Sequence, residues 1–242
     1  MREAPRISSY EWAGGREAML RFGPDDGPVV VVALPLFEEA NRTRAFAGSI
    51  CRALAVLGIG SVLADLPGQG ESVVPTVAMT LPGLRAAFAA VPGSHAMAIR
   101  SGALLVDKRP AWLLAPQDSS ALLRELARIK GGPLTGEGVE VAGNLLSAAF
   151  LADLGRTPHP GEGRGPVAVN NERLPDLPSA SQLGPGLRRG GARVVRLTSD
   201  NQAADRHVDG PALWRRSEPD NDLAFAEMLG ADIAAWIAAC AG

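Results

Sequence analysis

The stretch that decides the fold is Val29-Val-Val-Val-Ala-Leu34. It contains no polar residue, and turn-forming residues border it, in the cluster at 23–28 and at Pro35. A short apolar run bounded in this way is typical of a strand whose two faces are both covered, as in a parallel sheet. We therefore predict a central buried strand at 29–34.

Strand and helix patterns alternate on both sides of this strand. Upstream, residues 7–12 and 17–22 flank Gly14-Gly15 and predict a hairpin. Downstream, apolar residues recur at helical spacing as far as Gly58. Further strands are predicted at 61–64, 95–99, 111–115, 166–170 and 193–197, and further helices near 81–90, 120–130, 179–189 and 223–240. This alternation predicts an α/β fold with a mostly parallel central sheet flanked by helices.

Length and composition narrow the class of protein. The chain has 242 residues, of which 46% are hydrophobic and 21% charged, so we expect a single globular domain over 1–242. The 24 basic and 26 acidic residues balance to a net charge of −2, which argues against binding to nucleic acid or to a membrane surface. Two cysteines are too few for a disulfide framework, and we find neither a signal-peptide pattern nor an apolar run long enough for a transmembrane segment. We expect a cytoplasmic protein.

Three loops that follow predicted strands carry the residues best suited to chemistry, at 35–44, 65–72 and 98–103. The carboxyl ends of parallel strands meet at one edge of a sheet, where α/β proteins bind their ligands. The loops contain neither a phosphate-binding nor a dinucleotide-binding pattern, and histidines, cysteines and acidic residues are not at zinc-ligand spacing. We therefore expect a small-molecule partner, no cofactor and no metal.

The second loop has Asp65, Gly68, Gly70 and Ser72 in a D-x-x-G-x-G-x-S pattern, and the third turns sharply from strand to helix between small residues. These features resemble the α/β-hydrolase superfamily. More narrowly, the chain resembles the hydrolase-like proteins encoded with exosortase systems, in four segments that keep the same order, at 35–44, 99–105, 139–143 and 210–214. The resemblance implies an α/β-hydrolase fold, for which we expect a reduced lid near 116–165, and a role near exopolysaccharide-linked protein sorting. It implies no particular substrate.

The strand-to-helix turn departs from the pattern of a working hydrolase. A nucleophile elbow needs small residues two positions before and two positions after the nucleophile, because the turn is strained. Ala98 and Gly102 satisfy this spacing and place Arg100 at the nucleophile position. Ser101 would require the β-branched Ile99 at the first small position. Steric fit therefore favours Arg100, whose guanidinium stays protonated and cannot attack a carbonyl.

The general base of a hydrolase is also hard to find. A triad needs a histidine late in the chain, and the loop at 210–214, where we expect it, has none. His207 lies slightly earlier, and Glu172 and Asp200 follow predicted late strands. An active hydrolase would have to use Ser101 with His207 and one of these two acids.

Arg100 needs a compensating negative charge, because a cation at a helix N-terminus is unfavourable. Glu38 or Glu39 in the first loop could supply it as a structural ion pair, or an anionic ligand could. Asn41 and Trp214 are further candidates for the pocket, although Asn41 could equally cap the following helix and Trp214 could equally belong to the core.

Two functions remain open on this basis. The first is a degenerate hydrolase that acts as a binding or accessory protein, with an anionic group held at Arg100. The second is an active hydrolase of an ester, thioester or amide that uses Ser101, His207 and Glu172 or Asp200.

Overall fold

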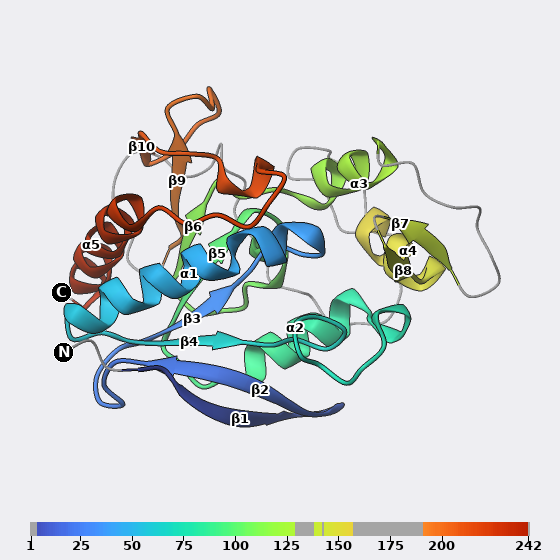
Figure 1. Cartoon of the computed structure of the whole chain (residues 1–242), viewed down its shortest axis with the longest axis horizontal. Helices are drawn as coiled ribbons and strands as arrows, with labels where there is room; N and C mark the ends of the chain where they lie inside the picture. The colour runs from blue at the N-terminus through green and yellow to red at the C-terminus, as the bar shows by residue number, and fades with distance from the viewer. Residues whose placement is uncertain (1–3, 129–137, 142, 157–190, 242) are drawn as a thin grey trace.

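An eight-stranded sheet forms the centre of the computed structural model, which describes residues 4–128, 138–141, 143–156 and 191–241 (Figure 1). In spatial order the strands are β1 (Arg6–Trp12), β2 (Gly15–Phe22), β4 (Gly60–Ala64), β3 (Val29–Ala33), β5 (His95–Ile99), β6 (Ala111–Leu114), β9 (Arg193–Leu197) and β10 (Arg206–Val208). The β1–β2 hairpin and the β2–β4 pair are antiparallel, and the pairs from β4 through to β10 are parallel. The predicted mostly parallel sheet and the predicted hairpin are confirmed.

Helices cover both faces of this sheet. The α-helices in the described part of the chain are α1 (Glu38–Val56), α2 (Leu81–Ala90), α3 (Ser119–Arg128), α4 (Ala148–Arg156) and α5 (Leu223–Cys240). The central strand β3 joins the two hydrophobic cores, since Val30 and Val32 pack with α1 and α5, while Val31 and Ala33 pack with α2 and α4. Burial on both faces explains why the sequence of β3 is continuously apolar rather than alternating.

Helix α5 is the one described helix that is long and apolar enough to cross a membrane. In the structure it packs against α1 and the sheet, and Leu229, Ile233 and Trp236 lie in the core. Core helices of globular proteins have the same composition, so α5 is a weak indication of a membrane span.

A buried acidic residue ties α5 to the sheet. Asp232 accepts a hydrogen bond from Trp112 Nε1 on β6 at 2.8 Å and pairs with Arg193 on β9 at 2.8 Å. Arg206 on β10 donates to the same carboxylate. Burial by itself would raise the pKa of Asp232, but these donors outweigh it and hold the pKa below its usual value. The carboxylate therefore joins one helix to three neighbouring strands.

Two elements differ from the sequence prediction. The edge strand β10 was not expected, because its three residues carry no apolar pattern and pairing with β9 stabilises it. The helix predicted at the turn after β5 is a short 3-10 segment, Arg100–Leu105, rather than an α-helix.

The chain between β6 and β9 holds α3, the small hairpin of β7 (Val139–Val141) and β8 (Asn144–Leu146), and α4. The identification of residues 116–165 as a lid and of 1–242 as one domain stays a prediction. The strand predicted at 166–170 and the helix predicted at 179–189 lie outside the described residues.

Candidate functional site

The carboxyl ends of three neighbouring strands carry unusual backbone conformations. Within the described part of the chain, the non-glycine residues with a positive φ are Phe37 (63°), Arg100 (54°) and Ala115 (46°). They follow β3, β5 and β6, which lie next to one another in the sheet. A left-handed backbone is unfavourable for residues with a Cβ atom, and it persists mainly at functional sites. This edge of the sheet is therefore the candidate site.

Arg100 occupies the tip of the turn that follows β5. The prediction from the spacing of Ala98 and Gly102 is confirmed by the left-handed φ of Arg100. A Cβ atom on Gly102 would lie only 2.5 Å from the carbonyl oxygen of Ala33 and 2.6 Å from that of Leu34. The turn thus passes so close to the end of β3 that only glycine fits at this position.

Ser101 points away from any accessible surface. It is completely buried, and its Oγ accepts a hydrogen bond from the backbone N–H of Leu36 at 2.9 Å. This contact holds the β3–α1 loop against the turn. In this arrangement the Ser101 hydroxyl makes a structural hydrogen bond with the Leu36 amide.

The residues of the alternative triad do not come together in the described structure. His207 is on the edge strand β10, three strands from β5, which corresponds to about 14 Å at the usual strand spacing. Its Nε2 lies 3.1 Å from the carbonyl oxygens of Asp200 and Gln202. Glu172 lies outside the described residues.

Asp200 is engaged in a contact of its own. Its carboxylate accepts hydrogen bonds from Arg196 Nη1 at 2.8 Å and from the backbone N–H of Gln202 at 3.0 Å. Burial would raise the pKa of Asp200, but these two donors outweigh it and lower the pKa. Asp200 therefore stabilises the turn between β9 and β10.

Two acidic residues from different helices surround the Arg100 guanidinium. Its Nε and Nη2 atoms each lie 3.3 Å from a carboxylate oxygen of Glu39 on α1, and Nη2 lies 3.1 Å from Glu125 on α3. The guanidinium also stacks over the Trp214 ring, 5.5 Å from the ring centroid. The side chains of Arg100 and Glu39 are only 17% and 12% exposed, so the pair is well shielded from water.

Gln117 completes this cluster. Its side-chain Nε2 donates to Glu125 at 2.7 Å, and its backbone N–H donates to the Arg100 carbonyl oxygen at 3.2 Å. Burial raises the pKa of Glu39, and the nearby carboxylate of Glu125 adds to this, while Arg100 opposes it. Two carboxylates thus face one guanidinium, and the cluster supplies more negative than positive charge.

Of the candidate pocket residues, Glu39 and Trp214 contact Arg100 directly. Glu38 is exposed and does not contact Arg100; its carboxylate lies 3.4 Å from the side-chain amide of Asn41. The prediction that Glu38 or Glu39 pairs with Arg100 thus holds for Glu39. Sequence reasoning missed Glu125, because nothing in an ordinary amphipathic helix signals which polar residue will face a turn 25 residues earlier.

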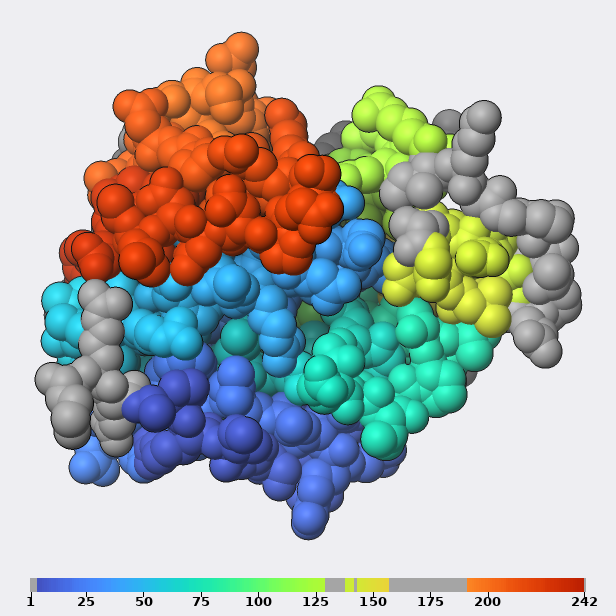
Figure 2. Space-filling view, in the orientation of Figure 1, coloured from blue at the N-terminus to red at the C-terminus, as the bar shows by residue number. Residues whose placement is uncertain are grey.

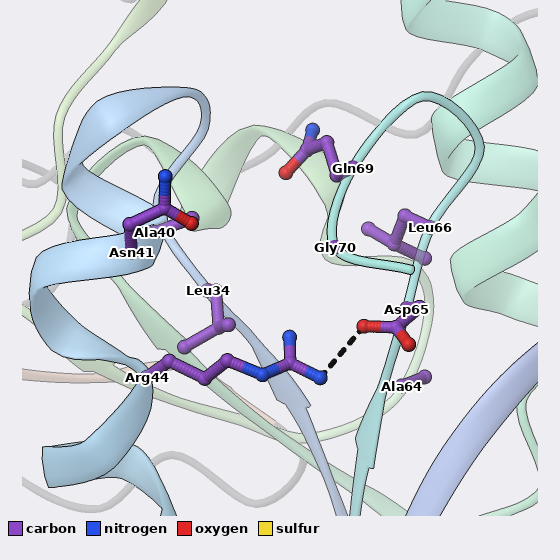
Figure 3. A pocket seen from close by; sticks show the side chains of 9 residues that line it. All are labelled: Leu34, Ala40, Asn41, Arg44, Ala64, Asp65, Leu66, Gln69 and Gly70. Atoms are coloured by element: carbon purple, nitrogen blue, oxygen red, sulfur yellow. Dashed lines mark hydrogen bonds and ion pairs between the residues drawn. The ribbon is translucent and has the colours of Figure 1, made fainter. Parts of the chain in front are cut away.

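A second feature lies on the other side of the first turns of α1. There a small pocket opens between α1 and the segment that follows β4 (Figure 3), and Figure 2 shows the surface hollowed between these segments. Its lining residues are Leu34, Ala40, Asn41, Arg44, Ala64, Asp65, Leu66, Gln69 and Gly70. Arg44 Nη2 donates to Asp65 Oδ1 at 2.7 Å inside this pocket. Helix α1 therefore places Glu39 beside Arg100, at the turn after β5 that we call the elbow, and places Arg44 in the pocket.

No group of three or more histidine, cysteine or acidic residues in the described part of the chain could hold a metal ion.

An eight-stranded, mostly parallel sheet with helices on both faces, and a strained strand-to-helix turn after β5, define an α/β-hydrolase-fold protein. A crystal structure described as "Putative hydrolase from Agrobacterium vitis S4" has this fold in common with the chain, with a TM-score of 0.51 and 14% identity over 97% of this chain and 98% of that one. At this identity the similarity shows the fold alone.

Other solved structures match in part. An epoxide hydrolase from Vigna radiata is 19% identical with a TM-score of 0.38, over 47% of this chain and 41% of that one. A protein from Pseudomonas aeruginosa is 13% identical with a TM-score of 0.45, over 65% of this chain and 72% of that one. The chain thus aligns with less than half the length of the epoxide hydrolase. The sequence matches no protein-family model and no curated protein.

Proposed function

We propose that this α/β-hydrolase-fold protein has no hydrolytic activity and acts as a binding or accessory protein. The observation that carries the proposal is Arg100 at the tip of the elbow, paired with Glu39 and Glu125. A guanidinium is protonated at every physiological pH and has no lone pair available for attack on a carbonyl. The residue at the nucleophile position therefore cannot start acyl transfer.

The neighbouring serine does not offer a replacement. A serine nucleophile needs an accessible hydroxyl and a base within hydrogen-bond reach. Ser101 is completely buried and engaged with the Leu36 amide, while His207 lies on the edge strand β10, three strands from β5, and contacts backbone carbonyls there. These positions favour a structural role for both residues.

Arg100 is best explained as a structural residue that fills the nucleophile position of the turn after β5 and pairs there with Glu39 and Glu125. An anionic ligand at Arg100 would have to displace Glu39 or Glu125, because these carboxylates already surround the guanidinium. Such a displacement would leave a carboxylate without its partner in a partly buried site, which is unfavourable. An anionic ligand of this protein is therefore better sought elsewhere on the same edge of the sheet.

Two reactions test the absence of hydrolysis. The purified protein is treated with a fluorophosphonate probe and, separately, with p-nitrophenyl acetate, and Ser101→Ala serves as the matched control. We expect no labelling and no turnover that depends on Ser101. Labelling or ester hydrolysis that Ser101→Ala abolishes would overturn the proposal and favour the Ser101 hydrolase.

The biological setting is part of the same proposal. We propose, on the resemblance of the segments at 35–44, 99–105, 139–143 and 210–214, an accessory role alongside an exosortase system, in the cytoplasm. Exosortase genes beside the coding gene, together with recovery of the protein in the soluble fraction of its native cells, would support it. A coding gene far from any exosortase gene would count against it.

A further inference from the structure

In the described part of the chain, one hydrogen bond joins the loop at 68–74 to the sheet, and it runs from Ser72 to the buried Glu17 of β2. We propose that this contact is a pH-sensitive latch, which holds the loop closed while Glu17 is protonated and releases it when Glu17 ionises. The loop supplies Gln69 and Gly70 to the wall of the pocket beside α1 (Figure 3), so its release would open that small pocket. The inference does not depend on the absence of hydrolytic activity.

The Ser72 hydroxyl organises the loop. Its Oγ donates to Glu17 Oε1 at 3.0 Å and accepts from the backbone N–H groups of Gly68 and Val74, both at 3.2 Å. Among the described residues, the other hydrogen bonds of the loop stay within the segment 66–79. Loss of the contact with Glu17 would therefore detach the loop from the sheet.

Glu17 is buried without a cation of its own. The residue is 4% exposed, and no arginine or lysine in the described part of the chain pairs with it. The neighbouring Asp65 carboxylate is equally buried and takes the nearby cation, Arg44, at 2.7 Å. Burial raises the pKa of Glu17; the hydrogen bond from Ser72 opposes this rise, and the charge of Asp65 adds to it. An ionised Glu17 is therefore unfavourable in the closed loop.

The other charged and titratable groups on the surrounding elements do not compensate this carboxylate. Tyr10, its cross-strand neighbour on β1, donates its hydroxyl to the backbone carbonyl of Asp65. Arg16 lies on the opposite face of the hairpin and pairs with the acid beside it on β1. Arg85, the charged residue of α2, donates to a backbone carbonyl of the 3-10 segment after β5. Glu71, next to Ser72, is exposed and negative.

The loop is built to move without disturbing the core. Gly68, at its start, has a left-handed φ of 75°, and Gly70 has one of 61°, so backbone conformations are open to them that other residues rarely adopt. Val73 is 91% exposed, which leaves the tip of the loop with little packing. Leu66, just before the loop, is buried in the core on the α2 side of the sheet. Movement can therefore be confined to 68–74.

The direction of the pH effect follows from burial. A protonated Glu17 is far less unfavourable to bury than an ionised one and still accepts the Ser72 hydrogen bond, whereas an ionised Glu17 gains hydration when the loop opens. Below the ordinary glutamate pKa the closed loop thus has its full stability. This stability is lost as the pH rises through the raised pKa that Glu17 has in the closed state.

Hydrogen exchange of the full chain, measured by mass spectrometry at pH 4 and pH 8 and corrected for the intrinsic exchange rates, tests the latch. We expect peptides over 68–74 to lose protection about fivefold or more at pH 8, while peptides from α5 change much less. In Glu17→Gln, which cannot ionise but can still accept from Ser72, protection of the loop should be the same at both pH values. Constant protection in the wild type, an equal loss in α5, or an unchanged loss in Glu17→Gln would each overturn the proposal.

Two further variants locate the effect. Glu11→Gln, at an exposed position of the same hairpin, is the matched control and should keep the pH dependence of the wild type. Ser72→Ala removes the hydrogen bond and leaves Glu17 in place, so its loop should exchange at pH 4 as fast as the wild-type loop does at pH 8. Wild-type protection at pH 4 in Ser72→Ala would overturn the latch. Ser101-dependent ester hydrolysis would overturn the proposed function and leave the latch in place.

Discussion

At the scale of single residues, the charges around Arg100 decide how the elbow is stabilised. One guanidinium faces Glu39 and Glu125, and Trp214 covers the flat side of the guanidinium. The ion pair with Glu39 is more buried than the one with Glu125, whose side chain is 41% exposed. The cluster therefore has one cation and two acids. Loss of Arg100 should lower the stability of the protein more than loss of either Glu39 or Glu125.

The first prediction concerns Arg100→Met. This change leaves two carboxylates close together without a cation, and we expect a loss of about 3 kcal/mol in the free energy of unfolding, the lower end of the range for broken buried ion pairs. The double change Arg100→Met with Glu39→Gln should be less destabilising, because it also removes one of the acids. Urea unfolding of both singles and the double measures the coupling, and additive effects would show that the two side chains do not interact.

The second prediction concerns pH. The pKa of Glu39 in the folded protein is raised, chiefly by burial, so ionisation of Glu39 lowers the stability of the folded state. Below the ordinary glutamate pKa, Glu39 is protonated and the folded state has its full stability. This stability is lost as the pH rises through the raised pKa that Glu39 has in the folded protein. We expect Glu39→Gln to gain stability relative to the wild type between pH 4 and pH 8, measured by urea unfolding. Glu38→Gln, on the exposed face of the same turn, is the control, and an equal pH dependence in the two variants would contradict the assignment.

At the scale of elements, Asp232 determines how α5 sits on the sheet. Trp112, Arg193 and Arg206 come from three strands and meet at this one carboxylate. Gly230 lies two residues before Asp232, and an added Cβ there would come within 2.8 Å of Ala53 Cβ, so α5 approaches α1 closely at this point. The buried Asp232 carboxylate and the close contact at Gly230 together fix the position of a helix whose other residues are mostly apolar.

The third prediction is that Asp232→Asn destabilises the protein by about 3 kcal/mol at pH 7, since it leaves two arginines without their shared acid. The pKa of Asp232 is lowered in the folded state, so this contribution is present above the ordinary aspartate pKa and is lost as the pH falls towards the folded value. Urea unfolding at pH 7 and pH 3 should show the difference between wild type and variant shrinking at the lower pH. Glu218→Gln, at an exposed position before α5, should change the stability by no more than about 0.5 kcal/mol.

At the scale of the whole molecule, β3 couples the two faces of the sheet. Its alternate residues belong to two hydrophobic cores, one with α1 and α5 and the other with α2 and α4. Neither core can lose its packing without exposing one side of the same strand. This arrangement favours a single cooperative unit over two independent halves.

The fourth prediction is therefore one unfolding transition for the full chain. Tryptophan fluorescence, which includes the buried Trp112, and far-ultraviolet circular dichroism should give the same urea midpoint. Two separated midpoints would contradict the single domain that the sequence predicts over 1–242.

The sequence by itself determined the class of fold and the residue at the tip of the elbow. A continuous apolar strand such as 29–34 is informative because burial on both faces leaves no polar position. The spacing of Ala98 and Gly102 is informative because a strained turn accepts only small residues on both sides of its tip, and a Cβ at Gly102 would meet the end of β3. Both signals are local, so they can be read without knowing what surrounds them.

Only the tertiary structure decided which charges meet. Glu39 rather than Glu38 faces Arg100, Glu125 joins them from α3, and Arg44 reaches Asp65 across the sheet edge. The edge strand β10 likewise depends on its pairing with β9. These contacts join residues that are distant in the chain, and their geometry follows from how helices rotate and pack on the sheet, for which no short pattern exists.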